Sequence, residues 1–391
     1  MKKIVGLVDC DSFFVSCEQS VNKDLKNKPV CVLSNRDGCV IARSREAKAL
    51  GIRMGMPYFM AKRDYPQAIY VSGNHELYGQ ISKKIMSFLQ NYSPIVDIYS
   101  VDEAFIDLTG LERLYKMNTF EIAKFIRNEI KEKLDMPVSI GISSSKTLAK
   151  LASDKAKDTF DGVYFIGEGN LFDELKNTPV EDIWGIGRNL TLTMKKNGIL
   201  NAYELVQKSD IFLNKLLGIN GLEMKHELLG ELVSPLTNEV KLPKSIQKTS
   251  AMAKFTSDKE YLKSNINYHI HSACAKLRKL DAKTLEIGVM LKTKDYKYFS
   301  QKETLNKAED FELEISKKIF ALFDKIYDST LTYRSTGVFF NKLTYNDACQ
   351  TFLFSDLETD EKKAKLSQCF DKLEAKFGKD IIQTGFVKKY I

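Results

Sequence analysis

The sequence predicts a multidomain protein of mixed α/β and α+β class, and three observations support this prediction. The chain has 391 residues, of which 43% are hydrophobic, which is enough for two or three ordinary cores. The first 165 or so residues alternate between strand-like and helix-like segments, whereas residues 171–235 follow a purely helical pattern with short Gly-containing turns. Residues 245–345 alternate strands with amphipathic helices, so we expect a separate small α+β unit there.

The first segment is expected to form an α/β sheet domain with one insertion, of βαββαβ type. Apolar residues at spacings of three and four predict its helices, and the Asp-Gly pair in the turn Asn35–Gly38 predicts a hairpin. The expected elements are a strand at Ile4–Val8, a helix carrying Phe14, Cys17 and Val21, the hairpin, a short helix ending at Gly51, a long helix at His75–Asn91, the paired strands "IVDIYSV" and "EAFIDLTG", a helix at Thr119–Leu134, the strand "PVSIGIS" and the basic helix "SKTLAKLASDKAK".

Beyond the helical segment, a linker is expected around "NEVKLPKSIQK". The strands "TLEIGVMLKT" and "TYRSTGVFF" then belong to the small α+β unit. Residues 346–391 are expected to form a partly ordered tail that holds one amphipathic helix, "DEKKAKLSQCFDKLEAKFG".

The positive charge of the chain is concentrated in one segment. The formal net charge is +8, and residues 241–300 alone hold 13 Lys or Arg against 5 Asp or Glu. Such a segment usually binds a polyanion, although a solvated lysine-rich face without a partner stays open as an alternative.

The cysteines and the apolar runs narrow the class of protein further. The seven cysteines include no C-x-x-C pair, which argues against a disulfide framework and a structural zinc, so we expect reduced and mostly buried thiols. No apolar run approaches the roughly 20 residues of a membrane span, and the first residues reach Asp9 too early for a secretory signal. We therefore expect no membrane partner and a cytoplasmic location.

Acidic residues near two predicted strands are the first candidates for chemistry. Asp9 closes the first strand-like stretch, and Asp102 with Glu103 lies within "YSVDEAFIDLTG". If the two strands are neighbours in one sheet, three carboxylates converge and would hold hard divalent cations such as Mg²⁺ through oxygen ligands. Acids at strand ends are also common surface residues, and spacing alone does not rank Asp11 and Asp107 against the others.

Four motifs resemble those of the Y-family DNA polymerases, and closely those of the UmuC type of translesion polymerase. They are "VDCDSFFVSCE", "SNRDGCVIARSREAKALGIRMGMP", "YSVDEAFIDLTG" and "GISSSKTLAKLASDKAK". The resemblance covers about residues 1–345 and implies a right-hand polymerase. It implies a palm at 1–170 with small fingers inserted at about 20–77, a helical thumb at 171–240, a little finger at 245–345 and the tail at 346–391.

The resemblance also implies the site residues. The metal ligands fall on Asp9, Asp102, Glu103 and the backbone carbonyl of Cys10, with two Mg²⁺ ions per site and Asp102 and Glu103 as the catalytic carboxylates. Phe14 matches the steric gate, an aromatic ring packed under the deoxyribose; by spacing alone it is an ordinary core residue.

Three cations match the positions that hold the incoming triphosphate. Arg45 and Lys48 are three residues apart and hence on one helical face, and Lys157 supplies a third contact. Many relatives carry Tyr in place of Arg45, Arg in place of Lys48 and Thr in place of Ala42, so a bidentate fork is replaced by a point charge at Lys48.

The remaining motifs concern DNA and protein partners. Gly185, Gly187 and Arg188 in "WGIGR" have the form of a helix-hairpin-helix turn that contacts a DNA phosphate. Residues Gln350, Leu353 and Phe354 of "QTFLF" resemble a sliding-clamp peptide, with Thr351 in place of the usual Leu; a buried strand would read the same. The helix after it could serve a UmuD-like accessory protein. The sequence "HIH" at His269–His271 is interpreted as a helix surface.

These patterns lead to one functional interpretation and two rivals. The chain is expected to be an error-prone, template-directed DNA polymerase that adds dNTPs to a primer 3′-hydroxyl on damaged DNA during the SOS response. A nucleotidyl cyclase could share the palm but has no duplex for the helix-hairpin-helix and the basic unit to hold. A catalytically silent, DNA-bound or clamp-bound accessory protein is the other alternative.

Overall fold

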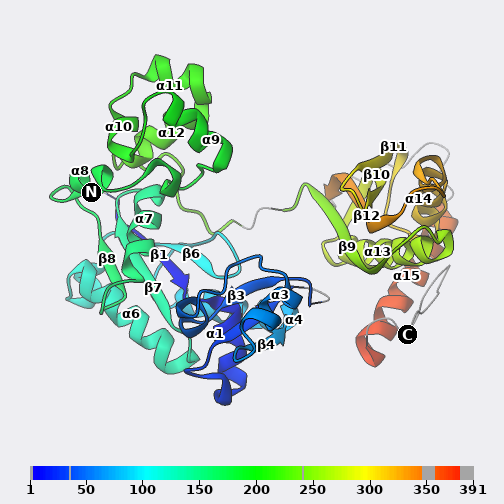
Figure 1. The fold of residues 1–391 in the computed structure, drawn as a ribbon, viewed down its shortest axis with the longest axis horizontal. Helices are drawn as coiled ribbons and strands as arrows, with labels where there is room; N and C mark the ends of the chain where they lie inside the picture. Colours follow the sequence, from blue (N-terminus) through cyan, green and yellow to red (C-terminus); the bar gives the residue numbers. More distant parts are fainter. Residues whose placement is uncertain (1–2, 35–36, 240–241, 346–356, 379–391) are drawn as a thin grey trace. The chain divides into compact units, whose positions relative to one another are not determined.

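The computed structural model describes residues 3–34, 37–239, 242–345 and 357–378. The chain divides into two compact units, residues 1–240 and 241–391 (Figure 1). Each unit has its own sheet and its own hydrophobic core. None of the helices in the described ranges is long and apolar enough to cross a membrane.

The central sheet of the first unit has five strands in the order β5-β6-β1-β7-β8. β1 pairs with β6 and β7 in antiparallel register, and β7 pairs with β8 in parallel. All residues of β1 and β7 are buried because helices cover both faces, which explains why these strands are mostly apolar throughout. The bounds are Val5–Cys10 (β1), Val96–Ile98 (β5), Glu103–Asp107 (β6), Val138–Ser143 (β7) and Val163–Phe165 (β8).

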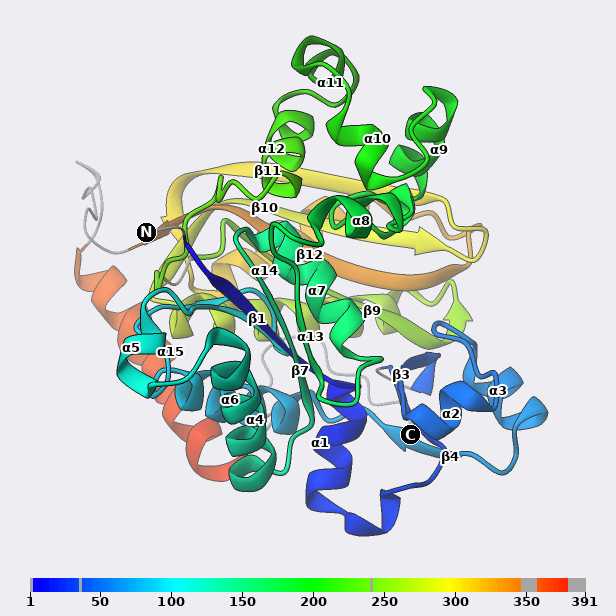
Figure 2. The ribbon, with the colours of Figure 1, turned by 90° about the vertical axis from the view of Figure 1, so that its left-hand side faces the viewer.

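Helices lie on both faces of this sheet (Figure 2). Leu7 and Phe105 pack with Ala149 of α7 on one face, whereas Val8 and Ile106 belong to the core beneath α4 and α6 on the other. α7 begins at a Ser145 cap, and α6 begins at a capping box formed by Asn118 with Glu121. The bounds are Phe13–Val21 (α1), His75–Leu89 (α4), Leu111–Tyr115 (α5), Thr119–Leu134 (α6) and Lys146–Ala156 (α7).

A small three-stranded sheet, in the order β3-β2-β4, is inserted between α1 and α4. The predicted hairpin is confirmed, because β2 and β3 pair in antiparallel register; β4 joins β2 in parallel. The predicted short helix is also present, and Gly51 after it has φ +88°, as expected of a glycine that ends a helix. The bounds are Val30–Leu33 (β2), Val40–Arg43 (β3), Arg45–Ala49 (α2), Tyr58–Asp64 (α3), Ile69–Ser72 (β4) and, before β2, the 3-10 helix Lys23–Leu25.

The rest of the first unit is helical, as predicted. Its core gathers Leu175, Val180, Leu205 and Leu213, and it continues to Leu148 of α7. The bounds are Leu171–Lys176 (α8), Val180–Asp182 (a 3-10 helix), Arg188–Lys196 (α9), Ala202–Val206 (α10), Asp210–Leu217 (α11) and Ile219–Leu228 (α12).

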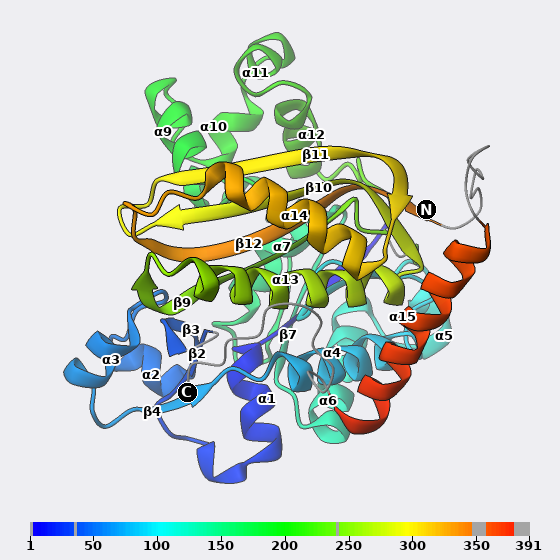
Figure 3. The ribbon, with the colours of Figure 1, turned by 90° about the vertical axis from the view of Figure 1, so that its right-hand side faces the viewer.

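The second unit is an antiparallel sheet, in the order β11-β10-β12-β9, with α13 and α14 on one face (Figure 3). Its core lies between the helices and the central strands, with Ile266, Val289, Phe323 and Phe340 fully buried. β11 is an edge strand whose residues are largely exposed. The bounds are Ser245–Thr256 (β9), Lys259–Lys279 (α13), Ala282–Thr293 (β10), Tyr298–Glu309 (β11), Glu312–Ile326 (α14) and Tyr333–Tyr345 (β12).

The amphipathic helix predicted within the tail is α15, Leu357–Phe377. It docks on α13 and α14 through charged groups: the guanidinium of Arg278 contacts both carboxylate oxygens of Asp371, and His271 Nε2 lies 2.7 Å from Glu374 Oε1. His271 Nδ1 lies 2.9 Å from Glu312 Oε2.

Two predictions from the sequence concern the histidines of "HIH" and the cysteines. The interpretation of "HIH" as a helix surface is wrong, because His269 is only 3% exposed and lies 3.2 Å from Thr336 Oγ1, while His271 is held between two carboxylates. The expectation of mostly buried cysteines is confirmed for the six described ones, of which four are buried and none forms a disulfide with another; Cys349 lies outside the described residues.

Candidate active site

Asp9 and Glu103 meet on one face of the five-stranded sheet. The register pairs Asp9 of β1 with Glu103 of β6, and both side chains share the face of Leu7 and Phe105, which is the α7 side. Asp9 is 5% exposed. The two strands are therefore neighbours, as the convergence of their acids required, and the buried carboxylate of Asp9 lies beside the half-buried carboxylate of Glu103.

Asp102 occupies a bend just before β6, in agreement with the prediction of one strand that ends at Val101 and a partner that begins at Glu103. Its carbonyl accepts a hydrogen bond from the Cys10 N–H at 2.9 Å, which fixes its backbone beside the end of β1. The Asp102 carboxylate accepts a hydrogen bond from Ser100 Oγ at 2.5 Å, and Ser100 Oγ also accepts from the N–H of Glu103. Ser100 thus organises the bend that carries both acids.

Two lysines of the α7 segment neutralise the carboxylates. Lys150 Nζ lies 3.0 Å from Asp9 Oδ2 and also contacts Glu103, and Lys157 Nζ lies 2.9 Å from Asp9 Oδ2. Burial acts to raise the pKa of Asp9, but its hydrogen bond with Glu103 and the two ammonium groups leave that pKa below its ordinary value. Burial and the same hydrogen bond raise the pKa of Glu103. The site therefore needs positive charge to keep both carboxylates ionised.

The donor atoms fit a hard divalent cation. Asp9, Asp102 and Glu103 offer only oxygen, the ligand that Mg²⁺ prefers. The Cys10 thiol is buried in the core, and burial raises its pKa well above its ordinary value, so only the backbone carbonyl of Cys10 is suited to a metal. Within the described ranges, no three His, Cys, Asp or Glu side chains lie close enough together to form a metal centre. The carboxylate of Asp102 is hydrogen-bonded to Ser100 instead.

Phe14, the expected steric gate, is held by a stack of side chains from α4. Its ring lies 4.6 Å from that of Tyr78 at an interplanar angle of 18°, and His75 meets it edge-on at 5.8 Å. Tyr78 is buried and donates its hydroxyl hydrogen bond to Glu18 at 2.6 Å. The ring of Phe14 is thus backed by a fixed wall, as a residue that selects by shape requires.

The cations predicted for the triphosphate come from two elements. Arg45 and Lys48 are exposed on α2, and Lys157 ends α7. Burial and the positive charges of Arg43 and Lys157 lower the pKa of Lys48. The positive charges of Lys48, Arg43 and Lys157 repel one another, so an anion bound between them would be stabilised.

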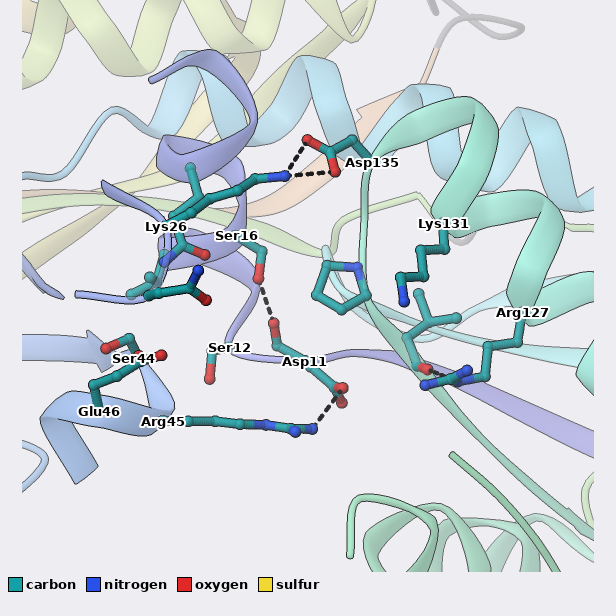
Figure 4. A pocket seen from close by; sticks show the side chains of 15 residues that line it. Asp11, Ser12, Ser16, Lys26, Ser44, Arg45, Glu46, Arg127, Lys131 and Asp135 are labelled. Atoms are coloured by element: carbon teal, nitrogen blue, oxygen red, sulfur yellow. Dashed lines mark hydrogen bonds and ion pairs between the residues drawn. The ribbon is translucent and has the colours of Figure 1, made fainter. Parts of the chain in front are cut away.

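A pocket of about 320 Å³ opens beside α2 and the start of α1 (Figure 4). Arg45 reaches across it and lies 3.5 Å from Asp11 Oδ2, and Asp11 also accepts from Ser139 at 2.8 Å. Lys131 and Arg127 of α6 enter it from the other side. Spacing alone could not decide whether Asp11 is a metal ligand. In the structure its carboxylate contacts Arg45 and Ser139.

The "WGIGR" motif leads into α9. Gly185 has φ +93°, a conformation that favours glycine, and Gly187 is the N-cap of α9, which leaves Arg188 exposed in its first turn. A helix-hairpin-helix motif implies an α-helix before the turn, but the structure has a 3-10 helix there. Trp184 packs against Tyr99 and Phe105, at ring distances of 5.1 and 5.9 Å, and so ties the turn to the strands that carry the acids.

The clamp-like residues Gln350, Leu353 and Phe354 lie outside the described residues. Sequence reasoning also missed several groups of the site: Lys150, Ser100, Tyr78 and Glu18. Lys150 was within a quoted motif, seven residues before Lys157, and two helical turns place both on the same face. Tyr78 and Glu18 meet across 60 residues, and no local pattern shows this.

Comparisons with known proteins give a consistent picture. The model of the impB/mucB/samB family matches residues 8–154, and that of its C-terminal domain matches residues 243–353. Protein UmuC of Salmonella typhimurium is 33% identical over 96% of this chain and 91% of its own length, and DNA polymerase IV of Dehalococcoides mccartyi is 32% identical over 97% and 96%. A solved Y-family polymerase chimera of Dbh and Dpo4 has a TM-score of 0.73 at 26% identity, covering 88% of this chain and all of that one.

Proposed function

The chain belongs to the impB/mucB/samB family of Y-family, UmuC-type DNA polymerases, and we propose that Asp9, Asp102 and Glu103 are its catalytic metal ligands. It is a DNA-directed DNA polymerase of translesion synthesis that binds DNA and dNTPs and depends on divalent metal. The single observation that carries the site assignment is the pairing of Asp9 with Glu103 beside Lys150 on one face of the sheet.

The carboxylates would hold two Mg²⁺ ions, which when bound lower the pKa of the primer 3′-hydroxyl and offset charge on the leaving pyrophosphate. Asp9 and Asp102 would contribute to both ions, and Glu103 and the Cys10 carbonyl would complete the ligand set. Ser100 holds Asp102 and Glu103 in one bend, and Lys150 keeps Asp9 and Glu103 side by side. No side chain is needed as an obligatory general base.

The incoming nucleotide would lie between α2 and α7. Arg45, Lys48 and Lys157 are proposed to bind its phosphate oxygens, because mutual repulsion among Lys48, Lys157 and Arg43 is relieved by an anion. Phe14, backed by Tyr78, would reject a 2′-hydroxyl by shape.

DNA would be held by both units through contacts that do not read sequence. Gly185, Gly187 and Arg188 are proposed to place backbone N–H groups and a cation at a phosphate, since they form the turn before α9. The basic second unit would add salt-dependent affinity, each phosphate contact contributing about 0.9 to the slope of log K against log salt.

Two protein partners are proposed as well. A sliding clamp would bind Gln350, Leu353 and Phe354, and a UmuD-like accessory protein would bind near the tail; the likeness to UmuC supports both. Action in the cytoplasm and in the SOS response is proposed as well, and the same likeness supports it.

Primer extension by the purified full chain with Mg²⁺ and single dNTPs tests the proposal, on an undamaged template and on one with an abasic site. Asp102→Ala should abolish extension on both templates. Asp107→Asn is the matched control, because Asp107 lies at the opposite end of the strand that Glu103 begins and pairs with Lys3 at 2.9 Å. Extension by Asp102→Ala at the rate of the control would overturn the assignment and favour a catalytically silent accessory role.

A further inference from the structure

A cluster of exposed aromatic rings lies at one end of the sheet of the second unit. It comprises Phe255 near the end of β9, Tyr296 in the β10–β11 turn and Tyr298 at the start of β11, with exposed fractions of 49%, 65% and 57%. Two cations lie against these rings: the Arg334 guanidinium is 4.1 Å from the Tyr296 ring centroid, and Lys292 Nζ is 4.9 Å from it. We call these five residues the aromatic edge.

A β-bulge places Arg334 in the aromatic edge. On β12 the pairing with β10 passes from Tyr333 to Ser335, and the pairing with β9 skips the same residue. Arg334 is thus the extra residue in the ladder with β10, whereas in the ladder with β9 the larger excursion is on β9, between Ala251 and Thr256. A bulge redirects the side chain of its extra residue. The Arg334 guanidinium also lies 5.6 Å from the centroid of the Phe255 ring, so it contacts one ring of β9 and one ring of the β10–β11 turn.

Tyr296 is held in a strained conformation. Its φ is +67°, a region that costs a residue with a Cβ about 1–2 kcal/mol relative to the right-handed form. The turn is maintained by the hydrogen bonds from Tyr296 N–H to Thr293 O at 3.0 Å and from Lys294 N–H to Thr332 O at 2.9 Å. A glycine or asparagine would fit this position with less strain, so stability alone does not explain a tyrosine here.

The cations of the aromatic edge are not paired with carboxylates of the described residues. Among the described residues neither Arg334 nor Lys292 has an acidic partner within 4 Å, whereas Lys302 and Lys342 of the same sheet both pair with Glu286. In the turn itself Lys294 and Lys297 add two positive charges and Asp295 one negative charge, so the turn adds a net charge of +1. A surface that combines flat rings with uncompensated cations suits a ligand with both a π-face and a negative charge.

We propose that the aromatic edge binds unpaired nucleotides of single-stranded DNA. Bases would stack on the exposed rings, and phosphates would be held by Arg334 and Lys292. A paired base offers no free face to a protein ring, so a duplex would use the cations only. The inference rests on the proposed function in one respect: the single-stranded part of the polymerase template would be the ligand.

Fluorescence anisotropy with the full chain tests the inference in the absence of Mg²⁺ and dNTPs. The probes are two labelled oligomers of equal length and charge, one of thymidine nucleotides and one abasic throughout. The wild-type chain should bind the thymidine oligomer more tightly, and Tyr296→Asn should lose on the order of tenfold of that preference. Since asparagine accepts positive φ, this variant should fold at least as well as the wild type.

Two further variants separate stacking from charge. Lys292→Ala should weaken the binding of both oligomers and reduce the slope of log K against log salt by about 0.7. The preference for the thymidine oligomer over the abasic one should stay. Tyr268→Ala, which removes an exposed tyrosine of α13, is the matched control and should change neither quantity. An unchanged preference in both Tyr296→Asn and Phe255→Ser would overturn the inference, as would an equal loss of affinity for both oligomers.

Failure of this inference can be distinguished from failure of the proposed function. The binding assay requires no catalysis, so a wild-type chain that prefers bases but extends no primer would sustain the aromatic edge and refute the catalytic assignment. Normal extension without any base preference would do the reverse.

Discussion

The carboxylate site of the first unit and the aromatic edge of the second unit both gather cations, but they hold them in opposite ways. Lys150 and Lys157 are both paired with the buried carboxylate of Asp9, at 3.0 and 2.9 Å, whereas Arg334 and Lys292 lie against aromatic rings. In the first case the lysines balance an internal charge and keep a reactive site assembled. In the second case the positive charge stays available to a ligand.

Removal of a carboxylate should have the largest effect. Asp9→Asn removes a proposed metal ligand and the buried carboxylate that Lys150 and Lys157 share, so we expect the rate of dNTP insertion to fall by at least about 10³-fold. Single-turnover insertion measures this. A fall of less than tenfold would show that the paired cluster is only structural.

Phe14→Ala should relax selection of the sugar. Loss of a ring that stacks on Tyr78 opens space where a 2′-hydroxyl would lie, and we expect discrimination between dNTP and rNTP to fall by about 10- to 200-fold. The ratio of kcat/KM for the two nucleotides measures it. Phe14→Tyr keeps the ring and should keep the discrimination; equal ratios in all three proteins would contradict the gate.

Lys150→Met should destabilise the first unit. The substitution leaves Asp9 and Glu103 facing each other without the Lys150 ammonium, which should lower the free energy of unfolding by about 2 kcal/mol. Added Mg²⁺ should restore part of the lost stability. Denaturant unfolding with EDTA and with Mg²⁺ measures both effects. Lys124→Met, which breaks the exposed pair with Asp161, should cost under about 0.5 kcal/mol. Equal losses in the two variants would show that the buried cluster is not special.

The smallest effect concerns α15. The carboxylates of Glu312 on α14 and Glu374 on α15 raise the pKa of His271 to about 9, although burial opposes this. Because the folded pKa is above the unfolded value of 6.5, the contribution to stability is complete below pH 6.5 and is lost as pH rises through about 9. We expect about 1–2 kcal/mol over this window.

Unfolding of the second unit measured between pH 6 and 10 should show this loss in the wild type and not in His271→Gln. The same pH profile in both proteins would mean that another group is responsible. The contrast with the aromatic edge is that here a cation and two carboxylates hold the fold together.

The regular elements were predictable from local pattern. α6 and β7 follow apolar spacing closely, and the β2–β3 hairpin follows its Asp-Gly turn. The break at Asp102 was also predictable, because one strand was expected to end at Val101 and its partner to begin at Glu103, but the hydrogen bonds by which Ser100 shapes the bend were not. The buried position of His269 was not either, since helix α13 alone does not show that the sheet covers that face.

The sequence by itself determined the kinds of chemistry, because oxygen ligands, phosphate-binding cations and a ring at Phe14 are properties of residue types and of short motifs. It also determined that Asp9 and Glu103 lie on compatible strands. Only the tertiary structure decided that Lys150 reaches both of them, that Tyr78 backs Phe14 and that Arg334 stands in a bulge and contacts two rings. These contacts join residues about 40 to 140 positions apart, and no helical or strand period extends over such distances.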